Sequence, residues 1–239
     1  MPSAARFWTV IPAAGSGVRM GTSVPKQYLP LVGRTVIGQV LECLLTHARI
    51  AGVVVAIAAG DHYWPRYQPR HPAKPVRVAQ GGRERAHSVL NGLHALQDEL
   101  KADDWVLVHD AVRPCLYAED LDKLILALEQ DPVGGILAVP LTDTVKRVEE
   151  GHRIHNTPDR QKFWRAFTPQ MFRYGVLQKA LESVLAAGQV PTDEAAAVEL
   201  QYPDQVRVVE GRGDNIKITR PADLVLAEAI LAGRKANRA

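Results

Sequence analysis

The chain has 239 residues, 46% of them hydrophobic, and its 29 basic and 26 acidic residues leave a formal net charge of +3. A chain of this length can bury a sizeable core, and α/β proteins of this size often form one domain, so we expect a single domain over residues 1–239. The near-balanced charge offers no sustained basic stripe, which argues against nucleic acid as a partner and favours small phosphorylated molecules.

Cysteine use and apolar patterning indicate the compartment. Cys43 and Cys115 lack metal-ligand spacing, and one such pair favours reduced thiols over a disulfide framework. Residues 1–6 lack a secretory hydrophobic region, and no apolar stretch approaches the roughly 20 residues that span a bilayer. We therefore expect a soluble, cytoplasmic protein without a membrane partner.

The first predicted element is a strand over the apolar run 7–11, which leads into a loop with glycines at 15, 17 and 21. Without side chains, backbone N–H groups can approach a polyanion closely, and the loop can adopt positive φ angles. Arg19 and Lys26 flank this loop, so both can reach one triphosphate and stabilise charge that develops during phosphoryl or nucleotidyl transfer. The pattern predicts a phosphate-binding loop of an enzyme, with these two cations as its catalytic residues.

The spacing of this loop differs from those of two commoner phosphate loops. A P-loop requires G-x-x-x-x-G-K-[ST], but Lys26 lies beyond Gly21 and beside Pro25. A dinucleotide-binding loop requires G-x-G-x-x-G, whereas the chain has one further residue before its last glycine. An ordinary strand-to-helix turn remains the structural alternative.

Apolar runs and helical patterns then alternate along the chain, as is typical of a parallel α/β sheet. Ligands bind such a sheet beyond the carboxyl ends of its strands, so we expect Gly15, Gly81 and Asp110, each of which follows a predicted strand, to meet at one edge. The further predicted strands cover 53–59, 76–79, 105–108 and 135–139, and the helices cover 36–48, 86–100 and 118–130.

Asp110 is the candidate metal ligand. It follows the predicted strand 105–108, and Mg²⁺ usually binds through one or two carboxylates together with substrate phosphates. The alternative is that Asp110 caps the next turn. The neighbouring His109 has no partner at metal-ligand spacing, and we assign it no catalytic role.

The polar interval 141–168 breaks the alternation and predicts an extended arm or hairpin, although a solvated surface loop fits its composition equally well. Beyond it, 174–187 is a predicted helix. The residues Thr192, Asp193 and Glu194 supply a hydroxyl N-cap and an acidic first turn for another helix, and we interpret the two acids as structural. Pro221 opens a final helix, and residues 232–239 are expected to be frayed.

The segment Pro12-Ala13-Ala14-Gly15-x-Gly17-x-Arg19-Met20, together with Pro25-Lys26-Gln27-Tyr28, resembles the signature of the methylerythritol-phosphate cytidylyltransferase family. Segments 81–89, 108–114, 143–146, 168–170 and 214–221 strengthen the resemblance, which runs from about residue 7 to about residue 231. It implies a Rossmann-like nucleotidyltransferase sheet, mostly parallel, with an extended β-arm for dimerisation. In similar proteins this arm exchanges between the subunits of a homodimer and contributes to the partner's acceptor site.

The resemblance also implies the reaction. CMP passes from CTP to 2-C-methyl-D-erythritol 4-phosphate by in-line attack on the α-phosphate, with Mg²⁺ and without a covalent enzyme intermediate. The CTP-binding residues it implies are Pro12, Ala13, Ala14, Gly15, Gly17, Gly81, Gly82, Arg85, Ser88, Asp110 and Ala111. The acceptor-binding residues it implies are Arg113, Thr144, Arg160, Thr168 and Lys217.

Three alternatives stay open from the sequence. A cytidylyltransferase for another polyol phosphate, such as ribitol 5-phosphate, would keep the same loop. A nicotinamide dehydrogenase fits the β/α alternation but not the glycine spacing. A noncatalytic nucleotide sensor could keep the glycines but would have little need of the complete cationic set.

Overall fold

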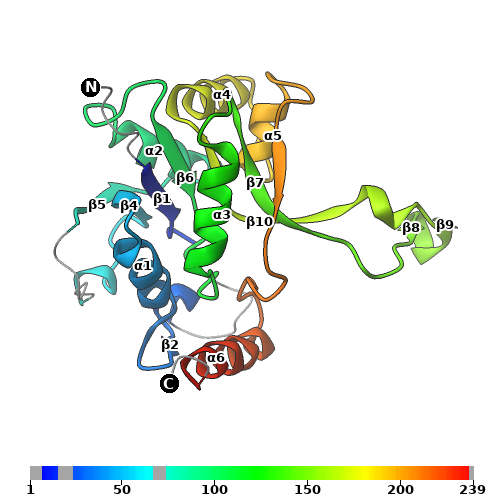
Figure 1. Cartoon of the computed structure of the whole chain (residues 1–239), viewed down its shortest axis with the longest axis horizontal. Helices are drawn as coiled ribbons and strands as arrows, with labels where there is room; N and C mark the ends of the chain where they lie inside the picture. Colours follow the sequence, from blue (N-terminus) through cyan, green and yellow to red (C-terminus); the bar gives the residue numbers. More distant parts are fainter. Residues whose placement is uncertain (1–6, 16–23, 67–73, 237–239) are drawn as a thin grey trace.

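The computed structural model describes residues 7–15, 24–66 and 74–236, and within these ranges a seven-stranded sheet forms the centre of the molecule (Figure 1). The order of the strands across the sheet is β11-β7-β10-β6-β1-β4-β5. Their bounds are β1 Phe7–Pro12, β4 Ile50–Ile57, β5 Val76–Gln80, β6 Trp105–Val108, β7 Gly134–Pro140, β10 Trp164–Arg173 and β11 Arg207–Glu210.

The sheet is mostly parallel, as predicted. The strand β1 pairs in parallel with β4 and β6, β4 pairs in parallel with β5, and β11 pairs in parallel with β7. Only β10, among the strands of this sheet that the structure describes, runs antiparallel to its neighbours, β6 and β7. Neither β10 nor β11 was among the expected strands. The first residues of β10, Trp164–Ala166, are exposed and belong to the polar interval, whereas the residues that follow are buried. Because the strand begins in a polar segment, its apolar pattern did not predict a strand.

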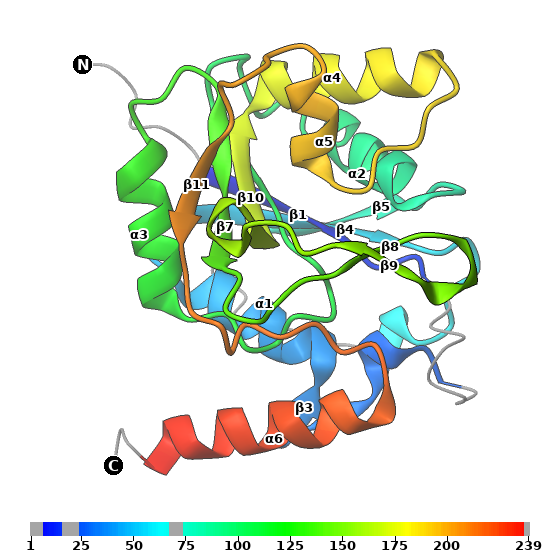
Figure 2. The same cartoon turned by 90° about the vertical axis from the view of Figure 1, so that its right-hand side faces the viewer.

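Helices cover both faces of the sheet (Figure 2). Successive side chains of a strand point to opposite faces, so Phe7 and Ile11 of β1 pack beneath one helical layer while Trp8 and Val10 pack beneath the other. The first layer contains α1 (Val36–Thr46) and α3 (Ala118–Leu128), and the second contains α2 (Arg85–His94), α4 (Tyr174–Ala186) and α5 (Glu194–Glu199).

A third, smaller apolar cluster lies below the sheet, where α6 (Pro221–Ala236) packs on a hairpin of β2 (Pro30–Leu31) and β3 (Arg34–Thr35). The prediction of a frayed tail over residues 232–239 was wrong for residues 232–236, because α6 extends through Ala236. The guanidinium of Arg234 donates to the carbonyl oxygens of Cys115 and Leu116 and so fastens the end of this helix.

Two element boundaries differ from the predictions for local reasons. The helix α2 ends at His94, but Leu96 and Leu100 remain buried in the turns that follow, so the apolar spacing continues past the helix end. The N-cap of α5 is Asp193 rather than Thr192, because the Asp193 carboxylate accepts the Ala196 N–H at 2.9 Å.

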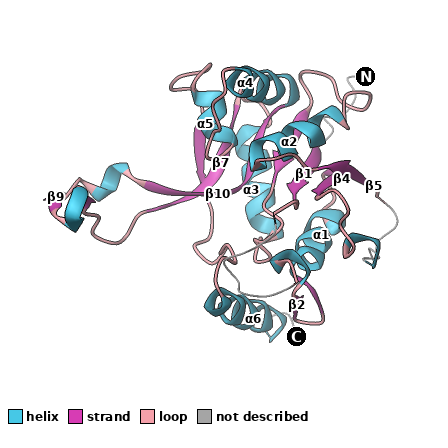
Figure 3. Ribbon diagram, turned by 180° about the vertical axis from the view of Figure 1, so that it is seen from behind, coloured by secondary structure: helices cyan, strands magenta, loops and turns pink. Residues whose placement is uncertain are grey.

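The expected arm is present as an extension of β7 and β10 away from the sheet, with β8 (Arg147–Val148) and β9 (Ile154–Asn156) paired near its end (Figure 1, Figure 3). Short 3-10 turns at Glu150–His152 and Arg160–Lys162 complete it. Its exposed part ends before Phe167 and Thr168, which are buried in the body of the molecule. Among the described residues, no helix has the length and apolar character needed to cross a membrane.

Candidate active site

A cavity of about 320 Å³ lies beyond the carboxyl ends of β1, β5 and β6, where the loops that follow these strands meet as predicted. Its lining also includes Lys26 and Gln27, which follow the glycine loop, and Lys217 from the segment before α6. The complete lining is Pro12, Ala13, Ala14, Gly15, Lys26, Gln27, Gly82, Arg83, Glu84, Arg85, Ser88, Asp110, Ala111, Val112 and Lys217.

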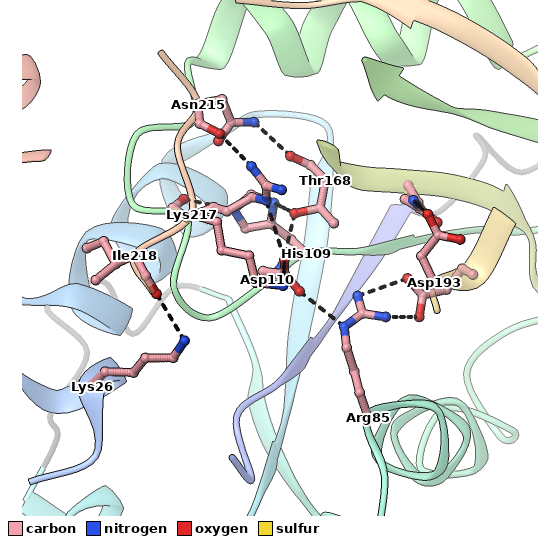
Figure 4. Close-up of polar contacts among 12 residues, drawn as sticks. Lys26, Arg85, His109, Asp110, Thr168, Asp193, Asn215, Lys217 and Ile218 are labelled. Carbon is pink, nitrogen blue, oxygen red and sulfur yellow. Dashed lines mark hydrogen bonds and ion pairs between the residues drawn. The ribbon is translucent and has the colours of Figure 1, made fainter. Parts of the chain in front are cut away.

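The glycine loop is held at its base by Gln27, a residue that the sequence did not single out. Its buried side-chain amide donates to the carbonyl oxygens of Ala13, at 2.7 Å, and Gly15, at 3.2 Å. The Lys26 Nζ donates to the carbonyl oxygen of Ile218 at 3.0 Å and so links this loop to the segment that carries Lys217 (Figure 4). The predicted residues Gly17 and Arg19 lie outside the described residues.

The turn at Gly81 and Gly82 presses against the loop after β1. A Cβ atom at Gly81 would lie 2.3 Å from the Cβ of Ala14, and one at Gly82 would lie 2.3 Å from the Cβ of His87, so only glycine permits this approach. The Ser88 hydroxyl accepts the Gly82 N–H at 3.0 Å and donates to the Glu84 carbonyl at 3.2 Å. These contacts bring backbone groups to the cavity wall, as the glycine pattern predicted.

Asp110 stands at the centre of a cluster of cations (Figure 4). Its Oδ1 accepts from Arg85 Nε at 3.1 Å, and its Oδ2 lies 2.9 Å from Lys217 Nζ and 3.3 Å from Arg113 Nε. Burial alone would raise the pKa of this carboxyl, but the charges of Arg85, Lys217 and Arg113 outweigh burial and hold the pKa well below its ordinary value. Asp110 is therefore a carboxylate at every pH at which the protein would work.

Arg85 joins Asp110 to a second buried carboxylate, that of Glu194. The Arg85 Nη1 and Nη2 atoms lie 2.6 Å and 3.0 Å from the two oxygens of Glu194, which is 1% exposed. The sequence marked Glu194 only as part of a helix start. Nothing in the local pattern indicates a partner more than a hundred residues away in the chain.

A buried hydrogen-bond network lies behind Asp110 and connects three loops. The Thr168 hydroxyl accepts the Asp110 N–H at 3.1 Å and lies 3.0 Å from His109 Nδ1. The His109 Nε2 lies 3.1 Å from the Arg113 carbonyl oxygen, which can only accept, so Nε2 carries the proton and Nδ1 accepts from Thr168. Burial lowers the pKa of His109 to about 4, so it is neutral near pH 7.

Asn215 closes the network from the C-terminal segment. Its side-chain amide donates to the Thr168 carbonyl at 2.8 Å, and its own backbone carbonyl accepts from Arg113 Nη1 at 2.7 Å. The network thus holds the middle of β10, the loop after β6 and the segment before α6 in one arrangement. His109 and Asn215 therefore lie behind the cavity, where their hydrogen bonds hold the loops that carry Asp110 and Lys217.

The structure brings together only part of the predicted acceptor set. Lys217 lines the cavity, and Arg113 and Thr168 lie directly behind Asp110. Thr144 and Arg160 lie on the exposed arm, outside the cavity lining, and Arg160 Nη1 donates to the Thr142 carbonyl at 2.8 Å. A single chain therefore places one of the five residues on the cavity wall and two more behind Asp110.

The site is chemically suited to a polyanion. The cations Lys26, Arg85 and Lys217 line the cavity, and fixed cations stabilise phosphate charge most strongly where water is partly excluded. In the ranges 7–15, 24–66 and 74–236, no group of three or more His, Cys, Asp or Glu side chains is placed to hold a metal ion. Two carboxylates of the described residues line the cavity, those of Asp110 and Glu84, and Asp110 is the one that stands among the cations.

Comparisons with known proteins agree with this geometry. Residues 7–233 match the family model described as "IspD: 2-C-methyl-D-erythritol 4-phosphate cytidylyltransferase". A protein of that name from Pseudomonas putida (strain GB-1) is 53% identical over 233 residues, which cover 96% of this chain and 97% of the relative. The protein of that name from Pseudomonas aeruginosa (strain PAO1) is 53% identical over 221 residues, which cover 92% and 93%.

Solved structures show the same fold. A crystal structure of 4-diphosphocytidyl-2C-methyl-D-erythritol synthase superposes with a TM-score of 0.81 at 36% identity, covering 95% of this chain and 99% of that one. The Francisella tularensis 2-C-methyl-D-erythritol 4-phosphate cytidylyltransferase superposes with a TM-score of 0.78 at 34% identity, covering 95% and 100%. By its sequence, its fold and the residues gathered at its sheet edge, the chain belongs to the 2-C-methyl-D-erythritol 4-phosphate cytidylyltransferase family.

Proposed function

We infer that the protein transfers CMP from CTP to 2-C-methyl-D-erythritol 4-phosphate, giving 4-diphosphocytidyl-2-C-methyl-D-erythritol and pyrophosphate in the non-mevalonate route to isoprenoid precursors. The observation that carries this inference is the family match over residues 7–233. The cationic cavity at the carboxyl edge of the sheet supports it, because the matched motifs converge there although they are far apart in the sequence.

In this proposal CTP occupies the cavity. The backbone at Pro12, Ala13, Ala14 and Gly15 and the turn at Gly81, Gly82 and Ser88 contact the nucleotide, because backbone donors and acceptors recognise a pyrimidine edge and a small cavity excludes a purine. Arg85, Asp110 and Ala111, which also line the cavity, contribute further nucleotide contacts. We assign Gly17 and Arg19, which lie outside the described residues, to binding of the triphosphate on the ground of the loop pattern alone.

The acceptor phosphate then attacks the α-phosphorus of CTP, and pyrophosphate leaves. A phosphate monoester is already ionised near neutral pH, so no protein nucleophile or general base is needed. Lys26 and Arg19 stabilise the charge that develops on the phosphates, and Arg113, Thr168 and Lys217 orient the acceptor. Holding two anions in line removes much of the entropic barrier to their encounter.

Magnesium fits the site through Asp110. A single carboxylate combined with substrate phosphates is sufficient for Mg²⁺. The Lys217 ammonium beside Asp110 is 38% exposed, so it can move aside for another cation. A bound ion would neutralise phosphate charge. Removal of divalent ions with EDTA should stop pyrophosphate release, and added Mg²⁺ should restore it. Activity that persists in EDTA would contradict the metal assignment.

We also propose a homodimer in which the arm 141–168 of one chain completes the acceptor site of the other with Thr144 and Arg160. This accounts for the position of both residues on the exposed arm, and for the exposure of Val148, Ile154, Phe163 and Trp164 there. Apolar side chains on a projecting hairpin suit burial against a partner.

Two further expectations remain proposals. We treat residues 1–239 as one nucleotidyltransferase domain, since the described strands outside the β2–β3 and β8–β9 hairpins belong to one sheet. We place the protein in the cytoplasm, since two unpatterned cysteines are typical of a reducing compartment.

The test is pyrophosphate release by the purified protein with CTP and Mg²⁺, comparing 2-C-methyl-D-erythritol 4-phosphate with ribitol 5-phosphate and with no acceptor. Release that depends on the methylerythritol phosphate supports the proposed function. Release with ribitol phosphate alone would keep the mechanism and change the substrate. Nucleotide binding without release from either acceptor would overturn the enzymatic proposal.

A further inference from the structure

The Arg85 side chain connects the cavity to Glu194, a buried acid that has no place in the reaction proposed above. Figure 4 shows the Arg85 side chain and its contact with Asp110. Its guanidinium uses three nitrogens: Nε contacts Asp110 at 3.1 Å, and the two terminal nitrogens contact Glu194 at 2.6 Å and 3.0 Å. Asp110 follows β6 and Glu194 begins α5, so one side chain joins elements on two sides of the site.

The geometry of this contact gives Glu194 control over the direction of the Arg85 Nε–H. A guanidinium is planar and its donors form a rigid fork, so a carboxylate that accepts from both terminal nitrogens fixes the plane of the whole group. With that plane fixed, the Nε–H has one direction, and it points at the Asp110 Oδ1.

Glu194 is itself held from a rigid element. The Gln170 side chain, on β10, accepts the Ala195 N–H at 2.9 Å and donates to the Asp193 carboxylate at 2.9 Å. The first turn of α5 is therefore fastened to the centre of the sheet on both sides of Glu194.

Helix formation does not account for a buried acid here. Asp193 already caps α5 with its own carboxylate, and Glu194 contributes no cap contact. Burying a carboxylate is costly unless it is paired, and Glu194 is 1% exposed with Arg85 as its ion-pair partner. A placement that is costly for the helix start is explained by what it does for Arg85.

We propose that Glu194 is a positioning residue for nucleotide binding, which acts through Arg85 to hold the Asp110 carboxylate at the cavity. This inference rests on the proposed function, since it assumes that Asp110 contacts CTP or its metal ion. It assigns a role in the reaction to an acid that the sequence pattern marked as structural.

The test compares Glu194→Gln with Asp193→Asn as a matched control. The first variant keeps the size of the side chain but removes the charge that holds Arg85. The second removes a neighbouring charge from the same turn, keeps an N-cap and alters only the Gln170 contact of Asp193, so it controls for disturbance of the start of α5 that does not involve Arg85. We expect Glu194→Gln to raise the KM for CTP by about 10- to 100-fold, the range produced by small misplacements in active sites, while the KM for the acceptor changes less than about twofold.

A merely structural role for Glu194 would lower the melting temperature in both variants and leave both KM values unchanged. A CTP KM for Glu194→Gln equal to that of Asp193→Asn would therefore overturn the inference. Wild-type protein that releases no pyrophosphate from CTP with the acceptor would instead refute the proposed function, so the two failures are distinguishable.

Arg85→Lys tests the same link from the other end, since an ammonium cannot reproduce the fork between the two carboxylates. If Glu194 acts through Arg85, Glu194→Gln should have less than a twofold further effect on the CTP KM in the Arg85→Lys background, as expected for groups that are coupled. Independent, multiplicative effects in the double variant would contradict the proposal. If Glu194→Gln alone does not fold, an unchanged CTP KM in Arg85→Lys overturns it.

Discussion

The sheet-edge cavity and the arm differ in how their charged residues are held. At the cavity, Asp110, Arg113 and Glu194 are buried and each contacts groups from other elements. On the arm, charged side chains such as Arg160 and Glu149 are exposed and contact other residues of the arm. In the proposed function, one chain thus builds the nucleotide half of the site by itself, while the arm carries the two proposed acceptor residues that lie outside the cavity lining of the same chain.

The largest expected effect is a loss of turnover from a substitution at the cavity. Replacing Lys26 by alanine should reduce turnover by roughly 10³- to 10⁵-fold, by analogy with the loss of an arginine finger. The fold should persist, because the Lys26 side chain is only half-buried. Pyrophosphate release and a melting curve measure the two effects, with the exposed Lys101→Ala as the control. A folded Lys26→Ala protein with near-normal turnover would remove Lys26 from the mechanism.

A smaller effect is expected on the arm side. Arg160→Ala should raise the KM for the acceptor by roughly 10- to 100-fold, since hydrogen bonds to charged groups contribute about 1.5–3 kcal/mol. The KM for CTP should stay the same, because Arg160 lies outside the cavity lining. Steady-state kinetics with each substrate varied measures the split. Arg147→Ala, also on the exposed arm, is the control.

Mixing the two variants sharpens the comparison. If arms exchange between subunits, a mixed dimer of Lys26→Ala and Arg160→Ala chains pairs an intact cavity on one chain with an intact arm from the other. At an acceptor concentration below the raised KM, activity after mixing and re-equilibration should exceed the sum of the two separate variants, reaching up to about one functional site per mixed dimer. A mixture no more active than that sum, despite sedimentation evidence for mixed dimers, would show that each arm serves its own chain.

Burial of His109 in the hydrogen-bond network should make the free energy of unfolding depend on pH. In the unfolded chain His109 binds a proton near pH 6.5, whereas in the folded protein burial lowers its pKa to about 4. The unfolded state therefore binds more protons between these values, and the protein loses stability as the pH falls through them, by about 3 kcal/mol in the free energy of unfolding.

Denaturant unfolding at pH 7 and near pH 4.5 measures this loss in the wild type and in His109→Gln, which cannot titrate. We expect the variant to be less stable at pH 7 but to lose less stability on acidification. The exposed arm variant His155→Gln should keep the pH dependence of the wild type. An equal acid loss in His109→Gln and wild type would exclude His109 as its source.

The smallest expected effect lies near the end of the arm. The Glu149 carboxylate lies 3.0 Å from His155 Nδ1, and the two side chains are 63% and 47% exposed. Solvent screens such pairs, so Glu149→Gln should change the free energy of unfolding by less than about 0.5 kcal/mol. Chemical denaturation of the variant measures the change. A loss well above 1 kcal/mol would show that this part of the arm is as tightly integrated as the cavity.

The features that could be predicted from the sequence are those that depend on neighbouring residues, namely the buried strands and the glycine turns. Continuous apolar runs such as 105–108 mark strands buried on both faces, and the glycines after two of these strands mark close backbone approach. Because the carboxyl ends of parallel strands share one edge, these two signals predicted that Gly15, Gly81 and Asp110 meet there. Gly15 and Asp110 line the cavity, and the turn at Gly81 reaches it through the next residue, Gly82.

The features that the sequence did not predict depend on partners distant in the chain. Glu194 reaches Arg85, Thr168 reaches His109, and Asn215 reaches Thr168, and in each case the tertiary fold makes the pair. The buried half of β10 was missed because it continues from the polar arm. The N-cap of α5 was one residue off because Thr192 and Asp193 are both good capping residues.

The antiparallel direction of β10 has a consequence for how this protein can be altered. The chain leaves the sheet at the end of β7 and re-enters it at the start of β10, and the two strands pair across this point, with Pro140 opposite Trp164. Both attachment points of the arm therefore lie together at the edge that holds the cavity. Because the two strands pair antiparallel where the arm begins, the arm can be shortened or lengthened by removing or adding one residue on each strand, or replaced as a whole. The strands of the sheet keep their register in each case. The arm is accordingly a natural point for grafting, through which acceptor preference could be changed while the nucleotide half of the site is left intact.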